Sequence, residues 1–199
     1  MHALVKTVEL ADLREEAKAC RACPLWRNAT QTVFGEGAEH APLMLVGEQP
    51  GDKEDLTGKP FVGPAGRLLD RALEDARIER KKTYVTNAVK HYKFVRHGKI
   101  RLHQRPDASE IAACNQWLVH ERSAVEPRLI VAMGATAVRG VFGKTMVIGR
   151  NRGRVIDLEG AKALITVHPS YILRLNGEDK EREYQAFVDD LKVAENFLR

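Results

Sequence analysis

The stretch GKIRLHQRP, residues 98–106, combines side chains suited to phosphate binding with one suited to nucleophilic attack. Lys99, Arg101 and Arg105 carry the positive charges that attract phosphate oxygens, and His103 lies among them. A correctly aimed neutral imidazole is a stronger nucleophile than water, but in a basic loop it also serves as a simple phosphate contact. The residue types alone leave both roles open.

A second stretch, VGEQPGDKEDLTGKPFVGPAG at residues 46–66, interleaves glycines with carboxylates. Glycines let the backbone approach a ligand closely, and Glu48, Gln49 and Asp52 would form polar walls. A carboxylate in such a place can stabilise a positive charge or activate a nucleophile. Each residue alone fits an ordinary strand-to-helix connection with solvated acids, whereas the whole string favours a binding site.

Three further residues fall in or beside short motifs, although each alone is more often structural. Phe61 would usually belong to a core, Asn87 to a turn after a strand, and His168 to a strand end. An asparagine amide both donates and accepts hydrogen bonds. Without their neighbouring motifs, the structural roles would be preferred.

The three cysteines cannot form a self-contained set of disulfides. Cys20 and Cys23 form a C-x2-C pair, which in a cytosolic protein indicates metal binding or redox chemistry first. Cys114 is distant in sequence, and burial within a helix is the commonest fate of such a residue.

Composition indicates one globular domain over residues 1–199, expected to be a monomer. Hydrophobic residues make up 44% of the 199 residues and charged residues 30%, and no apolar run is long enough for a membrane span. The N-terminus is too charged for a signal peptide, so a cytoplasmic location is expected. Residues 80–105 and 128–154 hold nine and six Lys or Arg and no acid. Such blocks suit a polyanionic partner, but two solvated faces would give the same counts.

The elements that must position these residues alternate between strand and helix. Short apolar runs predict core strands at 41–48, 83–89, 127–134 and 162–169, with a peripheral strand at 153–158. Helical spacing covers 8–20, 63–76, 107–124, 135–143 and 178–198, and residues 91–106 are expected to be irregular. This order predicts an α/β fold, a three-layer α/β/α sandwich around a mainly parallel four-stranded sheet. Ligands gather at the carboxyl ends of such strands, where the motifs fall.

Taken together, the motifs resemble the uracil-DNA glycosylase superfamily, specifically its iron–sulfur family 4. GEQPGDKEDLTGKPFVGPAG, TNAVKH (86–91), RLHQRP and VHPS (167–170) stand in the family's order, and the resemblance runs from CRACPLW to the closing helix. Gln49 and the KIRLHQRP loop are similar to the UdgX subfamily rather than to ordinary family 4 enzymes.

The resemblance implies excision of uracil from DNA, preferably single-stranded, with free uracil as product. The nucleotide must leave the stack and enter a pocket. There Phe61 would stack on the base, Asn87 would donate to O4 and accept from N3–H, and His168 would bond O2 as the anionic base departs. Glu48 would activate the nucleophile, with Gln49 and Asp52 as further polar contacts.

The subfamily resemblance also implies that His103 bonds to C1′ of the sugar and leaves the protein joined to DNA. Arg101 would fix the loop or bind phosphate. The sequence reads K-I-R-L-H where the subfamily often has K-R-R-I-H, so Ile100 replaces an arginine while the histidine register is kept. The DNA contacts expected from the motifs are Lys99, Arg101, Arg105 and Ser170.

Family 4 enzymes hold a [4Fe–4S] cluster with four cysteines, and this chain has three. His91 stands where the third cysteine of the family would fall. The implied ligands are therefore Cys20, Cys23, His91 and Cys114, a set that also suits zinc. Two other functions remain open: an ordinary family 4 enzyme that releases an abasic site, and a non-catalytic iron–sulfur module that binds uracil-containing DNA.

Overall fold

The computed structural model describes residues 9–199, so Val8, which the helical pattern included, lies outside them. The strands are β1 (Glu36–Gly37), β2 (Leu43–Gly47), β3 (Thr83–Asn87), β4 (Phe94–His97), β5 (Ile100–His103), β6 (Leu129–Met133), β7 (Val155–Leu158) and β8 (Ala161–Thr166). The α-helices are α1 (Leu10–Lys18), α2 (Asp52–Thr57), α3 (Pro64–Asp75), α4 (Ala108–Val125), α5 (Ala135–Phe142), α6 (Ile148–Asn151), α7 (Pro169–Leu173) and α8 (Gly177–Leu198). Short 3₁₀ turns cover Pro24–Arg27 and Arg80–Lys82.

The central sheet has six strands in the order β1-β3-β2-β6-β8-β7. The four parallel strands β3, β2, β6 and β8 are the ones that the sequence predicts. The predicted number of strands is wrong, because β1 and β7 add antiparallel edges. β1 is only two residues long, too short for an alternating pattern to show in the sequence.

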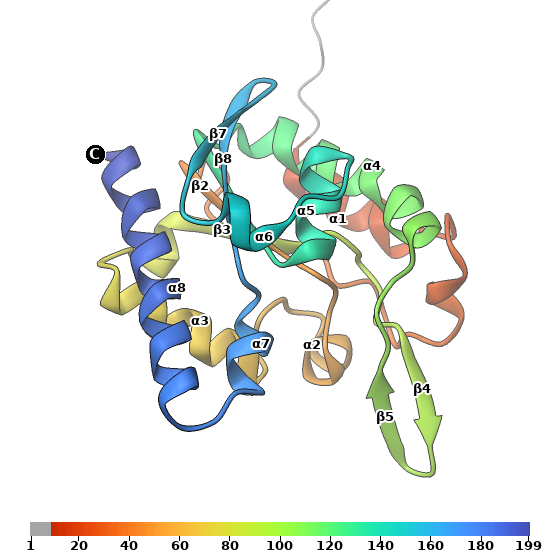
Figure 1. Cartoon of the computed structure of the whole chain (residues 1–199). Coiled ribbons are helices and arrows are strands. Elements are labelled where there is room, and N and C mark those ends of the chain that lie inside the picture. The colour runs from red at the N-terminus through yellow and green to blue at the C-terminus, as the bar shows by residue number, and fades with distance from the viewer. Residues whose placement is uncertain (1–8) are drawn as a thin grey trace, which may run out of the picture.

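Helices cover both faces of this sheet (Figure 1), and each face buries an apolar core of its own. Alternate residues of β2 face opposite sides, as strand geometry requires: Met44 and Val46 pack in the core with α1, α4 and α5, while Leu43 and Leu45 pack with α3 and α8. β2 and β6 are therefore apolar along their whole length, whereas β3 and β8 also bury the threonines Thr83, Thr86 and Thr166.

Residues 91–106, expected to be irregular, contain an antiparallel hairpin instead. β4 pairs with β5 through Phe94 opposite His103 and His97 opposite Ile100, and Gly98 makes the turn with φ of 60°. The hairpin projects from the body beside α2 (Figure 1). His103 is thus the last residue of a strand whose position follows from pairing.

Candidate active site at the carboxyl ends of the parallel strands

A cavity of about 530 Å³ opens where β2, β3 and β8 end. It is lined by polar residues from all three strand ends, by the aromatic ring of Phe61 and by His103 from the hairpin. The predicted site residues that it brings together are Glu48, Gln49, Asp52, Phe61, Asn87, His103, His168 and Ser170. Residues separated by more than 100 positions in sequence therefore share one space.

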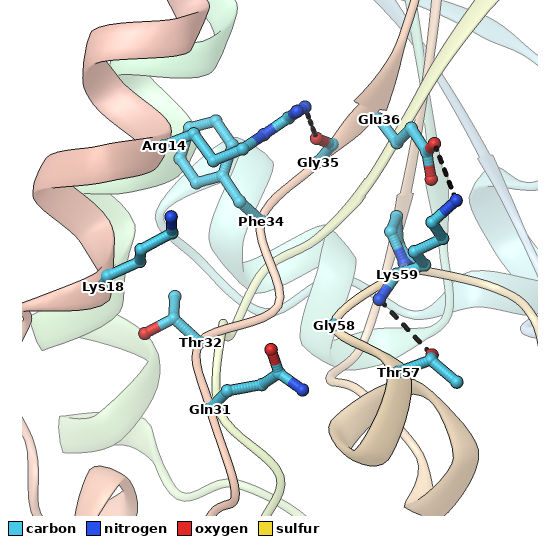
Figure 2. Close-up of a pocket in the computed structure, with 11 residues that line it drawn as sticks. Arg14, Lys18, Gln31, Thr32, Phe34, Gly35, Glu36, Thr57, Gly58 and Lys59 are labelled. Atoms are coloured by element: carbon cyan, nitrogen blue, oxygen red, sulfur yellow. Dashed lines mark hydrogen bonds and ion pairs between the residues drawn. The ribbon is translucent and has the colours of Figure 1, made fainter.

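A smaller pocket of about 230 Å³ lies beside α1 and the end of α2 and shares no residue with that cavity (Figure 2). Its cations already have partners: Arg14 donates to the Gly35 carbonyl, and Lys59 is 3.9 Å from Glu36. None of the residues that the sequence singles out lines this pocket.

Glu48 and His103 form the polar pair at the centre of the cavity. Oε1 of Glu48 is 3.2 Å from Nε2 of His103, and Oε2 accepts a hydrogen bond from the Thr136 hydroxyl at 2.9 Å. Burial alone would raise the pKa of Glu48, but the hydrogen bonds from His103 and Thr136 outweigh it and lower that pKa below its ordinary value. Glu48 is therefore a carboxylate at neutral pH, and it can accept a hydrogen bond from the imidazole and orient the ring. Thr136 was missed by the sequence reasoning because it lies in an ordinary helix.

His168 presents an N–H group to the cavity. Its Nδ1 accepts the backbone N–H of Ser170 at 3.1 Å, so the proton of the neutral ring belongs on Nε2. Burial lowers the pKa of His168 to about 4, and the nearby Glu48 carboxylate only partly offsets this effect. The ring is thus a neutral donor at physiological pH. Ser170, expected to contact DNA, uses its backbone N–H to set this tautomer, and its hydroxyl lies 2.8 Å from the same nitrogen.

Phe61 and Asn87 lie close together beneath the cavity and depend on Gly47. A Cβ atom at Gly47 would approach Oδ1 of Asn87 to 2.4 Å and Cζ of Phe61 to 2.5 Å. Phe61 itself has φ of 56°, a left-handed conformation that a bulky residue rarely adopts. Its backbone is fixed by close packing, since a Cβ at Gly66 would meet the Phe61 carbonyl oxygen at 1.7 Å.

Glu54, which the sequence reasoning did not single out, holds the glycine-rich loop in shape. Its carboxylate accepts the backbone N–H of Gly51 at 3.1 Å and that of Gly63 at 2.7 Å. The two ends of the segment that carries Phe61 are thereby tied to one buried side chain.

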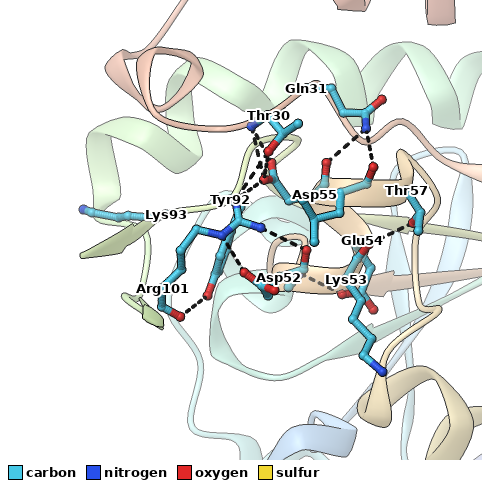
Figure 3. A network of polar contacts seen from close by, with 12 residues as sticks. Thr30, Gln31, Asp52, Lys53, Glu54, Asp55, Thr57, Tyr92, Lys93 and Arg101 are labelled. Carbon is cyan, nitrogen blue, oxygen red and sulfur yellow. Dashed lines mark hydrogen bonds and ion pairs between the residues drawn. The ribbon is translucent and has the colours of Figure 1, made fainter. Parts of the chain in front are cut away.

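Arg101 fixes the hairpin to α2 (Figure 3). Its guanidinium lies 2.5 Å from Asp52 and 2.6 Å from the fully buried Asp55, which also accepts hydrogen bonds from Thr30. With only 12% of its side chain exposed, Arg101 is committed to these carboxylates and not displayed to a phosphate. Of the two roles expected for it, the geometry supports loop fixing. Asp52 lines the cavity, and its carboxylate forms an ion pair with Arg101.

Gln49 ties the base of the same hairpin. Its amide nitrogen donates to the carbonyls of Lys93 and Gln104, at 3.2 and 2.9 Å, and its amide oxygen accepts the Lys93 N–H at 3.0 Å. The amide therefore joins the chain segments on either side of the hairpin, just where His103 must be held. Its contribution to base contacts remains a prediction.

Lys99 and Arg105 are exposed on either side of His103. Arg105 lines a second cavity of about 600 Å³, which shares Glu48, His103 and His168 with the first. Lys99 lies at the turn of the hairpin, where it lines a separate surface pocket together with Arg101. Arg105 therefore lies beside the site, whereas Lys99 lies at the tip of the hairpin and lines neither cavity.

The three cysteines are free thiols, and two of their sulfur atoms accept N–H hydrogen bonds. Trp117 Nε1 donates to Cys20 at 3.1 Å, and the Lys90 backbone N–H donates to Cys114 at 3.2 Å. Burial raises the pKa of Cys23 above its ordinary value and that of Cys114 to about 12. Such burial disfavours bare thiolates, so a bound cation would be needed to hold them deprotonated.

His91 is buried beside this region and has an unused nitrogen. Its Nε2 lies 3.0 Å from the Thr32 hydroxyl, whereas its Nδ1 is buried without a hydrogen-bond partner among the described residues. Burial lowers its pKa to about 4, leaving the neutral form that binds metals. Within residues 9–199, however, no three Cys, His, Asp or Glu side chains are grouped so that they could hold a metal ion. The thiol and imidazole groups are of the types that bind metals, but in this structure the four side chains are not arranged around a common point.

The structure also contains no helix, within the residues described, that is long and apolar enough to cross a bilayer.

Comparison with known proteins identifies the family of this chain. The family model of the uracil DNA glycosylase superfamily matches residues 34–192. A type-4 uracil-DNA glycosylase of Thermotoga maritima is 39% identical over 93% of this chain and 92% of its own length. Type-4 uracil-DNA glycosylases of Archaeoglobus fulgidus and Saccharolobus solfataricus are 33% and 30% identical, over 82% and 94% of this chain and 83% and 90% of theirs. The chain therefore belongs to the uracil-DNA glycosylase superfamily.

Proposed function

We propose that this protein excises uracil from DNA, as a DNA-repair enzyme, and becomes covalently bonded to the sugar through His103. The observation that supports it most is the 3.2 Å contact between His103 and the Glu48 carboxylate in a cavity that Asn87 and Phe61 also line. The names of the type-4 relatives support uracil excision. The covalent step rests on the position of His103.

Excision needs the base to leave as an anion. Phe61 offers the flipped uracil an apolar face, and the Asn87 amide pairs with O4 and N3–H. The neutral N–H of His168 donates to O2, where negative charge collects as the glycosidic bond breaks. Ionised Glu48 stabilises the positive charge that develops on the sugar.

The trapping step then joins protein and sugar. A lone pair of His103 forms the C1′–N bond, while the C1′–N1 bond breaks and its electron pair leaves on uracil. The remaining N–H of the resulting imidazolium stays paired with the Glu48 carboxylate, which already contacts the ring and balances its positive charge. Hydrolysis of the adduct would require expulsion of the imidazole and entry of water, so the protein would act once.

We propose that single-stranded DNA is the preferred substrate. The hairpin displays Lys99 and Arg105 to solvent beside His103. A flexible strand can bring its phosphates to these cations and place an unpaired base in the cavity without the cost of opening a duplex.

Denaturing electrophoresis tests the proposal. The protein is incubated with a labelled single strand that contains one uracil, then heated in detergent. A slow-migrating band that requires uracil is expected. Cleavage at an abasic site with no such band would overturn the covalent step and leave the ordinary glycosylase that the type-4 relatives suggest. Bound DNA with intact uracil would overturn catalysis altogether.

Gly47 offers a test of the base pocket. Gly47→Ala should lower the single-turnover rate of uracil release by about 100-fold, because the new methyl group displaces both Asn87 and Phe61. The affinity for DNA should change little, since phosphate contacts dominate it. An unaltered rate in a folded variant would contradict this model of the pocket.

We further propose that Cys20, Cys23, His91 and Cys114 hold a [4Fe–4S] cluster in a structural role, with zinc as the alternative metal. Such a centre would fix α1, α4 and the segment after β3 to one another. The partnerless Nδ1 of buried His91 supports its inclusion. The residues of the cavity perform the reaction.

The ligand set predicts a difference between two variants of His91. His91→Cys should retain bound metal, since thiolate is an alternative ligand, whereas His91→Ala should lose about half or more of it. Iron, sulfide and zinc contents, with visible absorption, are the measurements. Zinc without iron would establish the alternative, and equal metal content in both variants would exclude His91 as a ligand.

A further inference from the structure

An ion pair between Lys90 and Glu121 lies in the interior, outside the walls of the cavity. Both side chains are fully buried, and Nζ of Lys90 is 2.6 Å from Oε2 of Glu121. Lys90 follows β3, and Glu121 belongs to α4. Neither residue has a part in the mechanism above.

The pair is fully hydrogen-bonded, and it acts on the end of β3. Besides Glu121, the ammonium donates to the Thr86 hydroxyl at 2.6 Å and to the backbone carbonyl of Asn87 at 2.7 Å. Two of its three hydrogen bonds therefore hold the strand end that bears the base-reading amide. The carboxylate also accepts bonds of 2.9–3.0 Å from the Thr86 hydroxyl, the Tyr84 hydroxyl and the Gly35 N–H.

Stability alone does not explain the charges. Desolvation of a buried ion pair commonly cancels its attraction, and uncharged replacements are often tolerated. A neutral amide at position 121 could still accept the bonds from Gly35 and Tyr84. The Thr86 hydroxyl would keep its hydrogen bond to position 121 without Lys90. The hydrogen bond to the Asn87 carbonyl, in contrast, comes from the Lys90 ammonium.

We propose that Lys90, oriented by Glu121, is a positioning residue that fixes Asn87 for recognition of uracil. On one side, the sheet holds this segment, since Asn87 is registered with Gly47 and the Ala88 N–H bonds the Gly47 carbonyl at 3.0 Å. Lys90 holds the side away from β2. The inference rests on the proposed role of Asn87 in reading the base.

The strand that leads to His168 is held in a comparable way. Thr166 donates at 2.6 Å to Asp190 of α8, and the same carboxylate oxygen accepts two hydrogen bonds from Arg152, at 2.9 and 3.0 Å. A threonine near the strand end, a helix carboxylate and a cation recur at both base-contacting strands. This repetition favours positioning of the strand ends as the shared purpose.

The test pairs Lys90→Met with Lys90→Met/Glu121→Gln, because the single variant leaves a buried carboxylate without its counter-charge. In the double variant, the single-turnover rate of uracil release should fall about 10- to 100-fold. The dissociation constant for DNA should stay within about twofold, because the phosphate contacts are untouched. Tyr184→Phe, which removes a hydrogen bond to Asp75 at the far end of α3, is the matched control and should retain the rate.

A double-mutant cycle, in which the Lys90→Met/Glu121→Gln change is made with and without Asn87→Ala, separates positioning of Asn87 from a general loosening of the fold. If Lys90 acts through Asn87, the double change should alter the rate less than about threefold once the amide is gone. A full 10- to 100-fold effect in the Asn87→Ala background, or no effect in the unaltered background, would overturn the inference. If the unaltered protein released no uracil, the proposed function itself would fail, and this inference with it.

Discussion

Replacing His103 by serine should abolish the covalent adduct while uracil release continues. The groups proposed to expel the base, namely Glu48, Asn87 and His168, belong to other elements and remain in place. The shorter side chain vacates space beside Glu48, where a water molecule can enter and be activated by the carboxylate. The expected result is at least a ~100-fold loss of adduct, with free abasic DNA as the product and repeated turnover.

The hairpin supplies its own matched control. His97 is an exposed histidine on β4, three residues from Phe94, so it faces the side of the hairpin opposite to that of His103. His97→Ser should therefore form the adduct as the unaltered protein does. Gel shift after heating, with mass spectrometry of the cross-linked peptide, measures both variants. An adduct that persists in His103→Ser, or one mapped to another residue, would refute the assignment.

The parallel core was predictable mainly because β2 and β6 are short, wholly apolar runs. Residues such as Met44 and Leu45 face opposite cores, so every position of β2 is buried and the run ends where polar residues begin. The helix predicted over 107–124 was also correct, and its start is stabilised by Asp107, which accepts the N–H groups of Ser109 and Glu110. Of the two edge strands, β7 lies within the peripheral strand predicted at 153–158, whereas β1 gave no signal because it is only two residues long.

The hairpin was missed although its sequence contains a signal for it. Val95, His97, Ile100 and Leu102 share one face around the turn at Gly98, but they are largely exposed, so no buried stripe marks the strands. The base of the hairpin is instead fixed by hydrogen bonds from Gln49, more than 40 residues away in sequence, to the backbone of Lys93 and Gln104. No local pattern reveals such contacts.

The site residues themselves were identified from motifs, while their partners were not. The role of Arg101 depends on Asp55, a buried carboxylate 46 residues away. Thr136 reaches Glu48 only because β6 lies next to β2 in the sheet. Contacts of this kind follow from strand order, and strand order is a property of the folded chain.

The second large effect is expected at His168. His168→Ala should slow uracil release by about 10²- to 10³-fold, the usual consequence of removing one donor to a developing oxyanion. His168→Gln should recover part of that loss, because its amide N–H can reach toward the same oxygen. Single-turnover release of uracil measures both, with DNA affinity as the control for binding.

The protonation state of His168 also predicts how the rates of uracil release by the unaltered protein and by His168→Gln depend on pH. Because burial holds the pKa of His168 at about 4, the imidazole is neutral throughout the physiological range and gains a proton only when the pH falls toward that value. Glutamine does not titrate, so the ratio of the unaltered rate to the His168→Gln rate should stay constant between about pH 5 and pH 8. If instead a cationic imidazole drove the departure of uracil, this ratio would rise as the pH fell through neutrality. A rising ratio would therefore refute the neutral donor that the Ser170 N–H and the buried ring together specify.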